Sequence, residues 1–250
     1  MRVSEIGRVL VVGAGAMGHG IALVYAMGGY EVDLVDIQSE ALDRADTLIQ
    51  SSLSGLVSFG AVESTAVEPI LRRIARTTDL ERVAPRADLA IEAIVEDPQE
   101  KSALFATLET LLPRDTMIAS NTSGLDVFTL AARSSPSLLS RLVIHHFFLP
   151  PTIVPLVEVV PGPETSAEDL AFSVALLESL GRTPIVLDRF APNFIVNRYQ
   201  IALGTVTAQL LQEGIATPEM IDRAVKHSLG VRLPIVGVVQ SLDFTGLELF

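Results

Sequence analysis

The chain has no cysteine among its 250 residues, and only 5% of its residues are aromatic. The absence of cysteine excludes disulfide bonds, thiolate catalysis and cysteine-ligated metal, which fits a cytoplasmic protein. Basic residues are also scarce: 18 Lys and Arg stand against 30 Asp and Glu, and the formal charge is −12. Because binding to nucleic-acid phosphates needs clustered cations, we expect no nucleic-acid partner, and no metal site is predicted.

Long apolar runs and a leader segment are missing as well. No run reaches the roughly 18 residues that a membrane helix needs, and no charged-then-apolar segment opens the chain. We therefore expect an intracellular protein without a membrane partner. Hydrophobic residues make up 49% of the chain, which is enough for an aliphatic core. The length exceeds a typical domain of about 100–150 residues and predicts one large domain and a smaller one.

A glycine-rich turn lies near the start, in "RVLVVGAGAMGHGIALVYAMGGYEVDLVDI". This stretch predicts a buried strand at 8–12, a helix at about 16–27 and a second strand at 31–35. Strand, helix and second strand in this order form a βαβ unit. Such a unit places the turn at the amino end of its helix, where the helix dipole favours phosphates.

The three glycines of this turn have distinct expected roles. Gly13 permits the tight turn, Gly15 lets backbone amides approach a pyrophosphate, and Gly18 lets the helix pack closely on the strand. The spacing therefore predicts a dinucleotide site; the alternative is a turn that serves packing alone. The intervening residues Ala14, Ala16 and Met17 are included in the predicted cofactor site.

Asp36, at the end of the second strand, indicates which dinucleotide is bound. A carboxylate there accepts hydrogen bonds from the ribose hydroxyls and repels a 2′-phosphate. NAD is therefore favoured over NADP, and the alternative is a solvated aspartate with no ligand.

Strands and helices continue to alternate after this unit, which is typical of a doubly wound sheet. Further strands are predicted at 76–79, 87–93, 116–121, 141–147, 155–160 and 183–188, with helices at 39–59, 98–112 and 166–180. The fold class is therefore α/β, with a Rossmann-type doubly wound sheet.

The last segment changes character and predicts a smaller all-helical domain. Apolar residues recur three and four apart over 193–213, the period of a helix with one buried face: Val196, Tyr199, Leu203, Val206 and Leu210. Thr217 and Pro218 predict the start of a second helix, which extends to about residue 229. We predict an NAD-binding domain at 1–187 and a helical domain at 188–250.

The stretch "VIHHFFLPP" places two histidines, His145 and His146, at the end of a predicted strand. Strand side chains alternate between faces, so the two imidazoles point in opposite directions and only one enters a site. The residues alone leave three readings for either histidine: a catalytic base, a buried core residue, or no special role.

Several motifs in order resemble the L-3-hydroxyacyl-CoA dehydrogenase family over essentially the whole chain. They are "GAGAMGHGIA", "EAIVEDPQEKSALFATL", "SNTSGL", "HFFLPP…PLVEVVPGPETS" and "GRTPIVLDRFAPNFIVNR". The resemblance implies an NAD-dependent enzyme, with a Rossmann domain and a helical dimerisation domain, that oxidises a 3-hydroxyl to a ketone. Related branches include L-gulonate 3-dehydrogenase with lambda-crystallin, carnitine dehydrogenase and a diketoreductase. It also implies a homodimer, and a helical domain extending further than "DFTGLELF".

The same resemblance implies a catalytic pair. The family's histidine immediately precedes the aromatic residue of its motif, which is His146 here, and its glutamate matches Glu158. An imidazole has a pKa suited to removing a hydroxyl proton, and a neighbouring carboxylate fixes its tautomer. His146 is therefore the expected general base and Glu158 its partner, while a structural role remains the expectation for His145.

Four more positions carry implied roles. Ser123 and Asn197 match family residues that hold the reacting oxygen, Ser123 also lying beside the cofactor; the alternatives are a helix cap and an exposed helix residue. Glu96 and Lys101 match residues that line the nicotinamide side of the cofactor; the alternative is a solvated surface pair.

Two departures from the family leave the substrate open. Leu149 stands where the family motif has asparagine, and no Lys or Arg occurs from Thr47 to Ile70, where acyl-CoA enzymes carry a lysine-rich helix that contacts the CoA phosphates. An acyl-CoA substrate is the leading expectation. A free 3-hydroxy acid is the first alternative, and a catalytically silent NAD-binding protein is the second.

Overall fold

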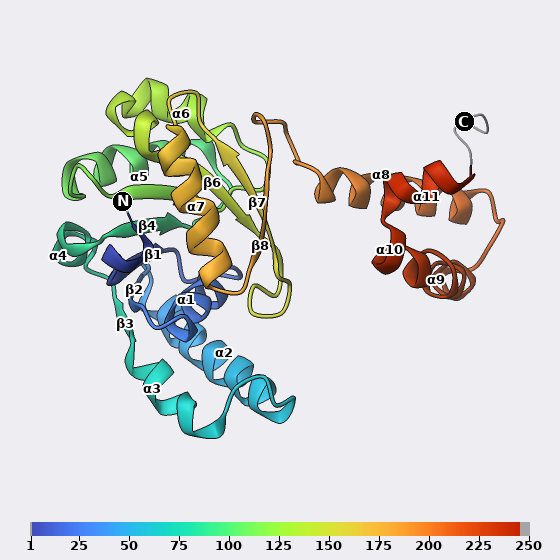
Figure 1. Cartoon of the computed structure of the whole chain (residues 1–250), viewed down its shortest axis with the longest axis horizontal. Helices are drawn as coiled ribbons and strands as arrows, with labels where there is room; N and C mark the ends of the chain where they lie inside the picture. Colours follow the sequence, from blue (N-terminus) through green and yellow to red (C-terminus); the bar gives the residue numbers. More distant parts are fainter. Residues whose placement is uncertain (1, 246–250) are drawn as a thin grey trace. The chain divides into compact units, whose positions relative to one another are not determined.

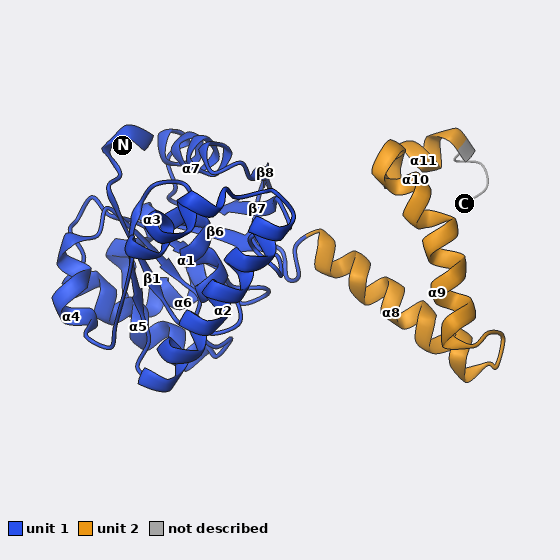
Figure 2. Ribbon diagram, turned by 90° about the horizontal axis from the view of Figure 1, so that it is seen from below, with its two compact units in different colours: residues 1–194 blue, residues 195–250 orange. Residues whose placement is uncertain are grey.

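A computed structural model describes residues 2–245 of the chain, divided into two compact units (Figure 2). Unit 1 ends at Phe194 and unit 2 begins at Ile195, so the division falls after Phe194 rather than after Leu187. The segment between these two positions belongs to unit 1, where Phe194 is buried in the core.

Unit 1 contains an eight-stranded sheet with the order β3-β2-β1-β4-β5-β6-β7-β8 (Figure 1). The strands are β1 Arg8–Val12, β2 Glu31–Val35, β3 Ile74–Thr77, β4 Leu89–Glu92, β5 Met117–Ser120, β6 Leu142–Phe147, β7 Leu156–Pro161 and β8 Thr183–Val186. All neighbouring pairs are parallel except β6 with β7, which is antiparallel. Strands β2 and β3 are added on one side of β1, and the strands from β4 onward are added on its other side. Ligands of such folds bind at the carboxyl ends of the strands where the order switches, which here is between β1 and β4.

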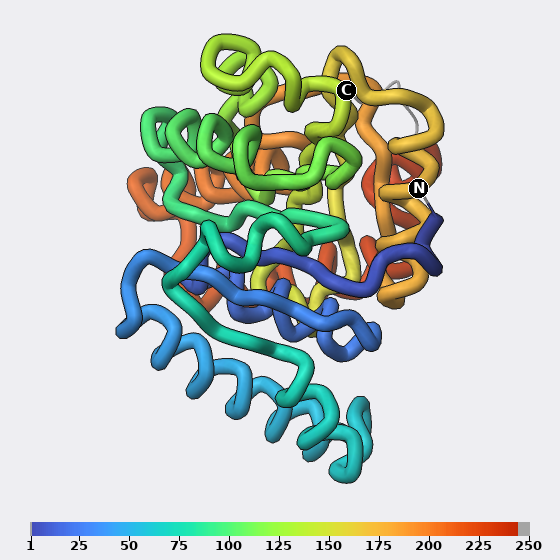
Figure 3. Tube along the Cα trace, turned by 90° about the vertical axis from the view of Figure 1, so that its left-hand side faces the viewer, coloured from blue at the N-terminus to red at the C-terminus, as the bar shows by residue number. Residues whose placement is uncertain are grey.

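Helices cover both faces of this sheet. They are α1 Gly18–Met27, α2 Ser39–Ser58, α3 Val67–Arg72, α4 Leu80–Val83, α5 Pro98–Leu111, α6 Val127–Ser134 and α7 Ala167–Ser179. One buried cluster joins the sheet to α1, α2 and α7, and the other joins it to α5 and α6. α2 and α3 extend from the same side of unit 1 (Figures 1 and 3). The predicted doubly wound α/β fold is confirmed.

Strand β1 illustrates why the sheet is buried on both faces. Val9 and Val11 belong to the cluster under α1, while Leu10 and Val12 belong to the opposite cluster. Because strand side chains alternate, a continuous apolar run has a core to enter on each side. The apolar run therefore specifies a central strand.

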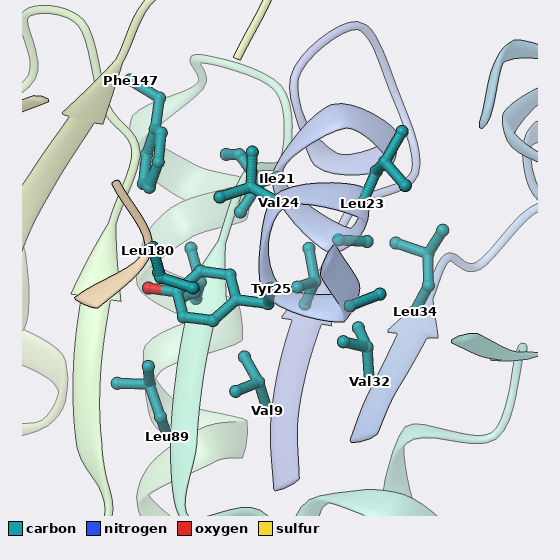
Figure 4. Close-up of a cluster of buried hydrophobic side chains, with 14 of the residues drawn as sticks. Val9, Ile21, Leu23, Val24, Tyr25, Val32, Leu34, Leu89, Phe147 and Leu180 are labelled. Atoms are coloured by element: carbon teal, nitrogen blue, oxygen red, sulfur yellow. The ribbon is translucent and has the colours of Figure 1, made fainter. Parts of the chain in front are cut away.

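Helix α1 is buried on nearly all sides, as expected of a helix that is apolar all round. The Tyr25 ring lies among Val9, Leu89 and Leu180 in this core (Figure 4). Within the described residues the Tyr25 hydroxyl has no hydrogen-bond partner, and burial together with Tyr30 raises the pKa of Tyr25 far above its usual range.

Unit 2 is helical, with α8 Val196–Gln212, α9 Pro218–His227, α10 Leu229–Val236 and α11 Val238–Thr245. The predicted cap is present, because the Thr217 hydroxyl accepts from the Met220 amide at 3.3 Å. The prediction that α8 has a buried face is wrong for this structure, because no residue from Ile195 to Phe244 is buried. Tyr199, Leu203 and Val206 remain about half exposed, because α9, α10 and α11 pack mainly on one another and only sparsely on α8.

Several bounds differ from the sequence-based prediction. Strand β3 begins at Ile74, because it pairs with β2 from Val32 onward, and the short helices α3, α4 and α6 were not predicted. Helix α6 has a readable cap, since Asp126 accepts from the Thr129 amide at 3.1 Å. Among residues 2–245 no helix is both long and apolar enough to cross a membrane.

Candidate active site

The glycine turn after β1 has the geometry expected of a close approach. Gly13 has φ +100°, and a Cβ there would lie 2.6 Å from the Ala93 carbonyl oxygen. A Cβ on Gly18 would lie 1.7 Å from the Gly13 oxygen, so α1 packs directly on the turn. A Cβ on Gly15, in contrast, would meet no atom of the described chain within 4 Å. Gly13 and Gly18 are therefore required by packing, whereas Gly15 faces open space.

Asp36 holds this turn through its carboxylate. Oδ2 accepts from the Ala14 amide at 2.8 Å, and Oδ1 accepts from the Gln38 amide at 2.9 Å. Asp36 is half-buried, so its oxygens keep further acceptor capacity toward solvent. Its place at the end of β2 suits a ribose diol, and the bond to Ala14 connects it to the turn.

The turn leads into an open helix start. In the described chain, Met17 at the N-cap of α1 makes no side-chain capping bond, and Gly15 and Ala16 are exposed. The first amides of a helix lack intrahelical acceptors and attract anions. The amides from Gly15 to Gly18 therefore fit the pyrophosphate of a dinucleotide.

A buried ion cluster lies behind the ends of β4 and β5. The Lys101 ammonium contacts both carboxylate oxygens of Glu92, at 2.8 and 2.7 Å, and lies 3.3 Å from Oε2 of Glu96. The side chains of Lys101 and Glu92 are 1% and 0% exposed. Ser120 donates its hydroxyl hydrogen bond to Glu92. The alternative of a solvated surface pair therefore does not describe Lys101.

Glu96 organises the segment that follows β5. Its Oε1 accepts from the Thr122 hydroxyl and from the amides of Ser123, at 2.9 Å, and Gly124, at 3.1 Å. Partial burial raises the pKa of Glu96, but the Thr122 hydrogen bond, the Lys101 charge and the two amides outweigh it and leave the pKa lowered. A charged Glu96 thus fixes the backbone that carries the exposed Ser123. Ser123 is not a helix cap, because α6 is capped by Asp126.

His146 and Glu158 form a buried hydrogen-bonded pair. Nδ1 of His146 lies 2.8 Å from Oε2 of Glu158, and the two residues are 3% and 1% exposed. They are directly opposite each other in the β6–β7 ladder. The imidazole also contacts the rings of Phe148 and Phe194, with centroids 4.5 and 5.1 Å away. The structure brings this predicted pair together.

His145 points to the other face of the sheet. It is fully buried, and among the described residues neither ring nitrogen has a hydrogen-bond partner. Burial lowers the pKa of His145 from 6.5 to about 4. It is therefore a neutral core residue at physiological pH.

Sequence reasoning missed Glu92, Ser120 and Asn121 as supports of the site. The Asn121 side-chain oxygen accepts from the Phe147 amide at 2.9 Å, which ties the end of β5 to the end of β6. Asn121 could have been recognised from the sequence, because it lies in the same "SNTS" motif as Ser123. Glu92 and Lys101 are nine positions apart on different elements, and no local pattern predicts their contact.

Two predicted positions lie differently. Asn197 is a half-buried residue in the first turn of α8, so it belongs to unit 2, and only the resemblance links it to the histidine. Leu149 is 60% exposed and lies in the loop between β6 and β7. The loop is anchored by Pro151, whose ring packs on Gly20 and whose carbonyl accepts from Arg182 at 2.9 Å.

A separate cavity of about 790 Å³ opens at the opposite edge of the sheet. Asp88, Thr116 and Arg141, which line it, lie just before β4, β5 and β6. Parallel sheets bind ligands at their carboxyl edge, where the glycine turn and His146 lie. We therefore assign the candidate site to the carboxyl edge and not to this cavity.

Comparison with known proteins agrees with this arrangement. Residues 8–190 match the NAD-binding domain of 3-hydroxyacyl-CoA dehydrogenase, and residues 194–250 match the C-terminal domain of the same family. The chain belongs to the 3-hydroxyacyl-CoA dehydrogenase family. It is accordingly an oxidoreductase that uses NAD, as predicted from the glycine turn and Asp36.

Members of the family with different named substrates are similar to the chain. A probable 3-hydroxybutyryl-CoA dehydrogenase of Deinococcus radiodurans is 38% identical and is aligned over 95% of this chain and 83% of its own. L-carnitine dehydrogenase of Streptomyces coelicolor is 32% identical, over 98% and 75%. The solved structure of an NAD-dependent 5-formyl-3-hydroxy-2-methylpyridine 4-carboxylic acid 5-dehydrogenase superposes with a TM-score of 0.86 at 30% identity, over 98% and 78%. The family thus establishes the reaction type and leaves the substrate to be inferred.

Proposed function

We propose that this protein catalyses the reversible NAD-dependent oxidation of the 3-hydroxyl of an L-3-hydroxyacyl-CoA to the 3-ketone, with His146 as the general base. The observation that carries this proposal is the 2.8 Å contact between Nδ1 of His146 and Oε2 of Glu158. The pair lies at the carboxyl end of β6, in the same parallel array as the glycine turn. With both at one edge of the sheet, the imidazole is suited to remove the hydroxyl proton of a carbinol, and a dinucleotide bound at the glycine turn is suited to accept the hydride from the same carbinol.

The pairing decides which nitrogen acts. A carboxylate accepts hydrogen bonds, so Glu158 favours the tautomer with a proton on Nδ1 and leaves the lone pair on Nε2. Nε2 then accepts the hydroxyl proton, and Glu158 stabilises the imidazolium that results. Bound NAD supplies the hydride acceptor. The residues that would hold it are those from Gly13 to Gly18, together with Asp36, Glu96, Lys101 and Ser123.

Ser123 and Asn197 are proposed to hold the 3-oxygen by hydrogen bonds. Support for Ser123 comes from Glu96, which accepts hydrogen bonds from the amides of Ser123 and Gly124 and so fixes the backbone that carries the exposed Ser123 side chain. Support for Asn197 comes from its matching position in the family motif. Such contacts position the carbinol and contribute orientation instead of proton transfer.

A free 3-hydroxy acid is the second candidate substrate. Its support is the absence of Lys and Arg between Thr47 and Ile70, a segment that includes most of α2 and the start of α3. A CoA nucleotide tail carries several negative charges and is attracted by local cations. The exposed Leu149, where the family has asparagine, is the one feature that favours a catalytically silent protein.

A homodimer formed through unit 2 completes the proposal. Tyr199, Leu203 and Val206 are about half exposed on α8, and Ile235 is 78% exposed on α10. Apolar exposure on this scale favours a covering partner. A cytoplasmic location is proposed on the absence of cysteine.

A paired substrate assay tests the proposed function. Acetoacetyl-CoA and free acetoacetate are each offered with NADH, and NADH oxidation is followed by absorbance. The acyl-CoA proposal predicts a kcat/KM at least about tenfold higher for the thioester. A tenfold preference for acetoacetate supports the free-acid alternative. Tight NADH binding without turnover of a panel of 3-keto acids and thioesters supports the silent one.

A further inference from the structure

The last two residues of unit 1 form a left-handed turn. Asn193 has φ 64° and Phe194 has φ 44°, and they are the non-glycine residues with positive φ among those the structure describes. Residues with a Cβ rarely adopt this conformation, and such strain persists where surrounding contacts impose it, often at functional sites. Two in succession indicate a turn that the surrounding contacts hold in place.

Phe194 packs directly against the proposed base. Its ring is 2% exposed, and its centroid lies 5.1 Å from that of His146, with 49° between the planes. Phe148 approaches the same imidazole at 4.5 Å and 63°. Phe190 supports Phe194 with an edge contact at 5.9 Å. The imidazole thus contacts two phenyl rings in addition to the Glu158 carboxylate.

Asn193 lies against the other half of the candidate site. Its side-chain oxygen is 3.3 Å from where a Cβ on Gly124 would stand. Gly124 donates its amide to Glu96, next to the Ser123 amide. One turn therefore contacts both the histidine from β6 and the serine segment that follows β5.

We propose that the Asn193–Phe194 turn is a positioning element of the active site, in which Phe194 sets the direction of the His146 ring. This inference rests on the proposed role of His146 as general base. A single hydrogen bond from Nδ1 to Glu158 leaves the imidazole free to tilt about that bond, which moves Nε2. Aromatic packing beside the ring removes this freedom. The left-handed backbone is needed because an extended residue 194 would direct its side chain elsewhere.

Phe194→Leu is the first test, because it keeps an apolar side chain and removes the ring. We expect kcat for acetoacetyl-CoA reduction to fall about 10- to 100-fold, as a misplaced catalytic group would cause. NADH affinity should change by no more than about twofold, and KM should change less than kcat. The nitrogen NMR shifts of the His146 imidazole should move toward a mixture of tautomers. Phe172→Leu is the matched control, because Phe172 is also buried, at 4%, but lies on α7 in the other core cluster; it should keep the kcat and the His146 shifts of the unaltered protein.

His146→Ala separates the two levels of the proposal. If that variant keeps its turnover, the proposed function fails, whatever Phe194 does. If it is inactive while Phe194→Leu keeps both kcat and the His146 NMR shifts, the inference about Phe194 alone is overturned. Should Phe194→Leu not fold, Phe194→Met serves the same comparison, because it also keeps an apolar side chain of similar reach.

Asn193 tests the backbone part independently. Glycine adopts positive φ freely, whereas alanine resists it. Asn193→Ala should therefore lower kcat and thermal stability more than Asn193→Gly does. Equal kcat and stability in the two variants would contradict a required left-handed turn. A large loss of kcat in both would assign the effect to the Asn193 side chain and overturn the backbone argument.

Discussion

His146 on β6 and Glu158 on β7 face each other at paired positions of an antiparallel ladder, with Nδ1 and Oε2 2.8 Å apart. Residues directly opposite in such a ladder share one face of the sheet, so their side chains meet without any loop adjustment. Both are buried. The backbone pairing therefore places the Glu158 carboxylate beside Nδ1 before any ligand binds, and the packing of Phe194 sets the remaining tilt of the ring.

Replacing Glu158 by glutamine tests the role of that carboxylate. The amide keeps the size but loses the charge, and it can donate to Nδ1, which favours the wrong tautomer. We expect kcat to fall by about 10²- to 10⁴-fold, with NADH affinity unchanged. Steady-state kinetics with fluorescence titration of NADH give both values. An unchanged kcat would remove Glu158 from the mechanism.

Lys101→Met tests the buried ion cluster. The variant leaves the Glu92 carboxylate buried without its cation, so we expect a loss of about 3–5 kcal/mol in the free energy of unfolding. Urea unfolding measures it. The double variant Glu92→Gln, Lys101→Met should lose less than the sum of the two single changes.

The control for this experiment is the other lysine. Lys226 pairs with Asp222 at 3.0 Å, but both side chains are more than two-thirds exposed, at 72% and 71%. Lys226→Met should shift the unfolding free energy by no more than about 0.5 kcal/mol. Equal effects of the two lysine substitutions would show that burial of Lys101 contributes nothing.

Gly15 and Gly18 separate cofactor binding from packing. A Cβ on Gly18 would collide with the Gly13 carbonyl at 1.7 Å, whereas one on Gly15 would meet no described atom within 4 Å. Gly18→Ala should therefore lower the melting temperature. Gly15→Ala should keep it and weaken NADH binding by about tenfold or more, because the new methyl group occupies space meant for the pyrophosphate. Unaltered NADH affinity in Gly15→Ala would contradict the assigned position of the cofactor.

Because His145 is buried, we expect the stability of the protein to depend on pH. Burial lowers the pKa of His145 to about 4, while the unfolded chain protonates near 6.5. Between pH 6.5 and 4, His145 is protonated in the unfolded state but not in the folded state. The free energy of unfolding therefore falls as the pH drops through this range, by on the order of 3 kcal/mol in total. Above pH 6.5 this contribution vanishes.

Urea unfolding at several pH values checks this slope. His145→Leu should be less sensitive to pH between 6.5 and 4, because its apolar side chain does not titrate. His227→Gln is the control, since His227 is exposed, and it should keep the slope of the unaltered protein. An identical slope in His145→Leu would show that other groups cause the acid sensitivity.

Local patterns predicted most of the sheet and the cofactor turn. Alternation, glycine spacing and the strand-end Asp36 depend on neighbours in sequence, so the unit from β1 to β2 was predicted closely. The pairing of His146 with Glu158 came from the family resemblance, and the antiparallel register of β6 and β7 explains it.

Contacts between distant positions were not predictable in this way. Glu92 and Lys101 meet because β4 and α5 pack together. Phe194 reaches His146 through a left-handed turn, and although asparagine tolerates positive φ, no residue-type rule indicates it at phenylalanine. The buried face expected of α8 was inferred from its period alone. Periodicity identifies an apolar face but cannot say whether the same chain covers it.

Turnover of His146→Ala is the most direct test of the account. Removing the base should lower kcat by about 10²- to 10⁴-fold while NADH still binds, and added imidazole should restore part of the rate. If the variant instead turns over acetoacetyl-CoA at the rate of the unaltered protein, His146 is not the base.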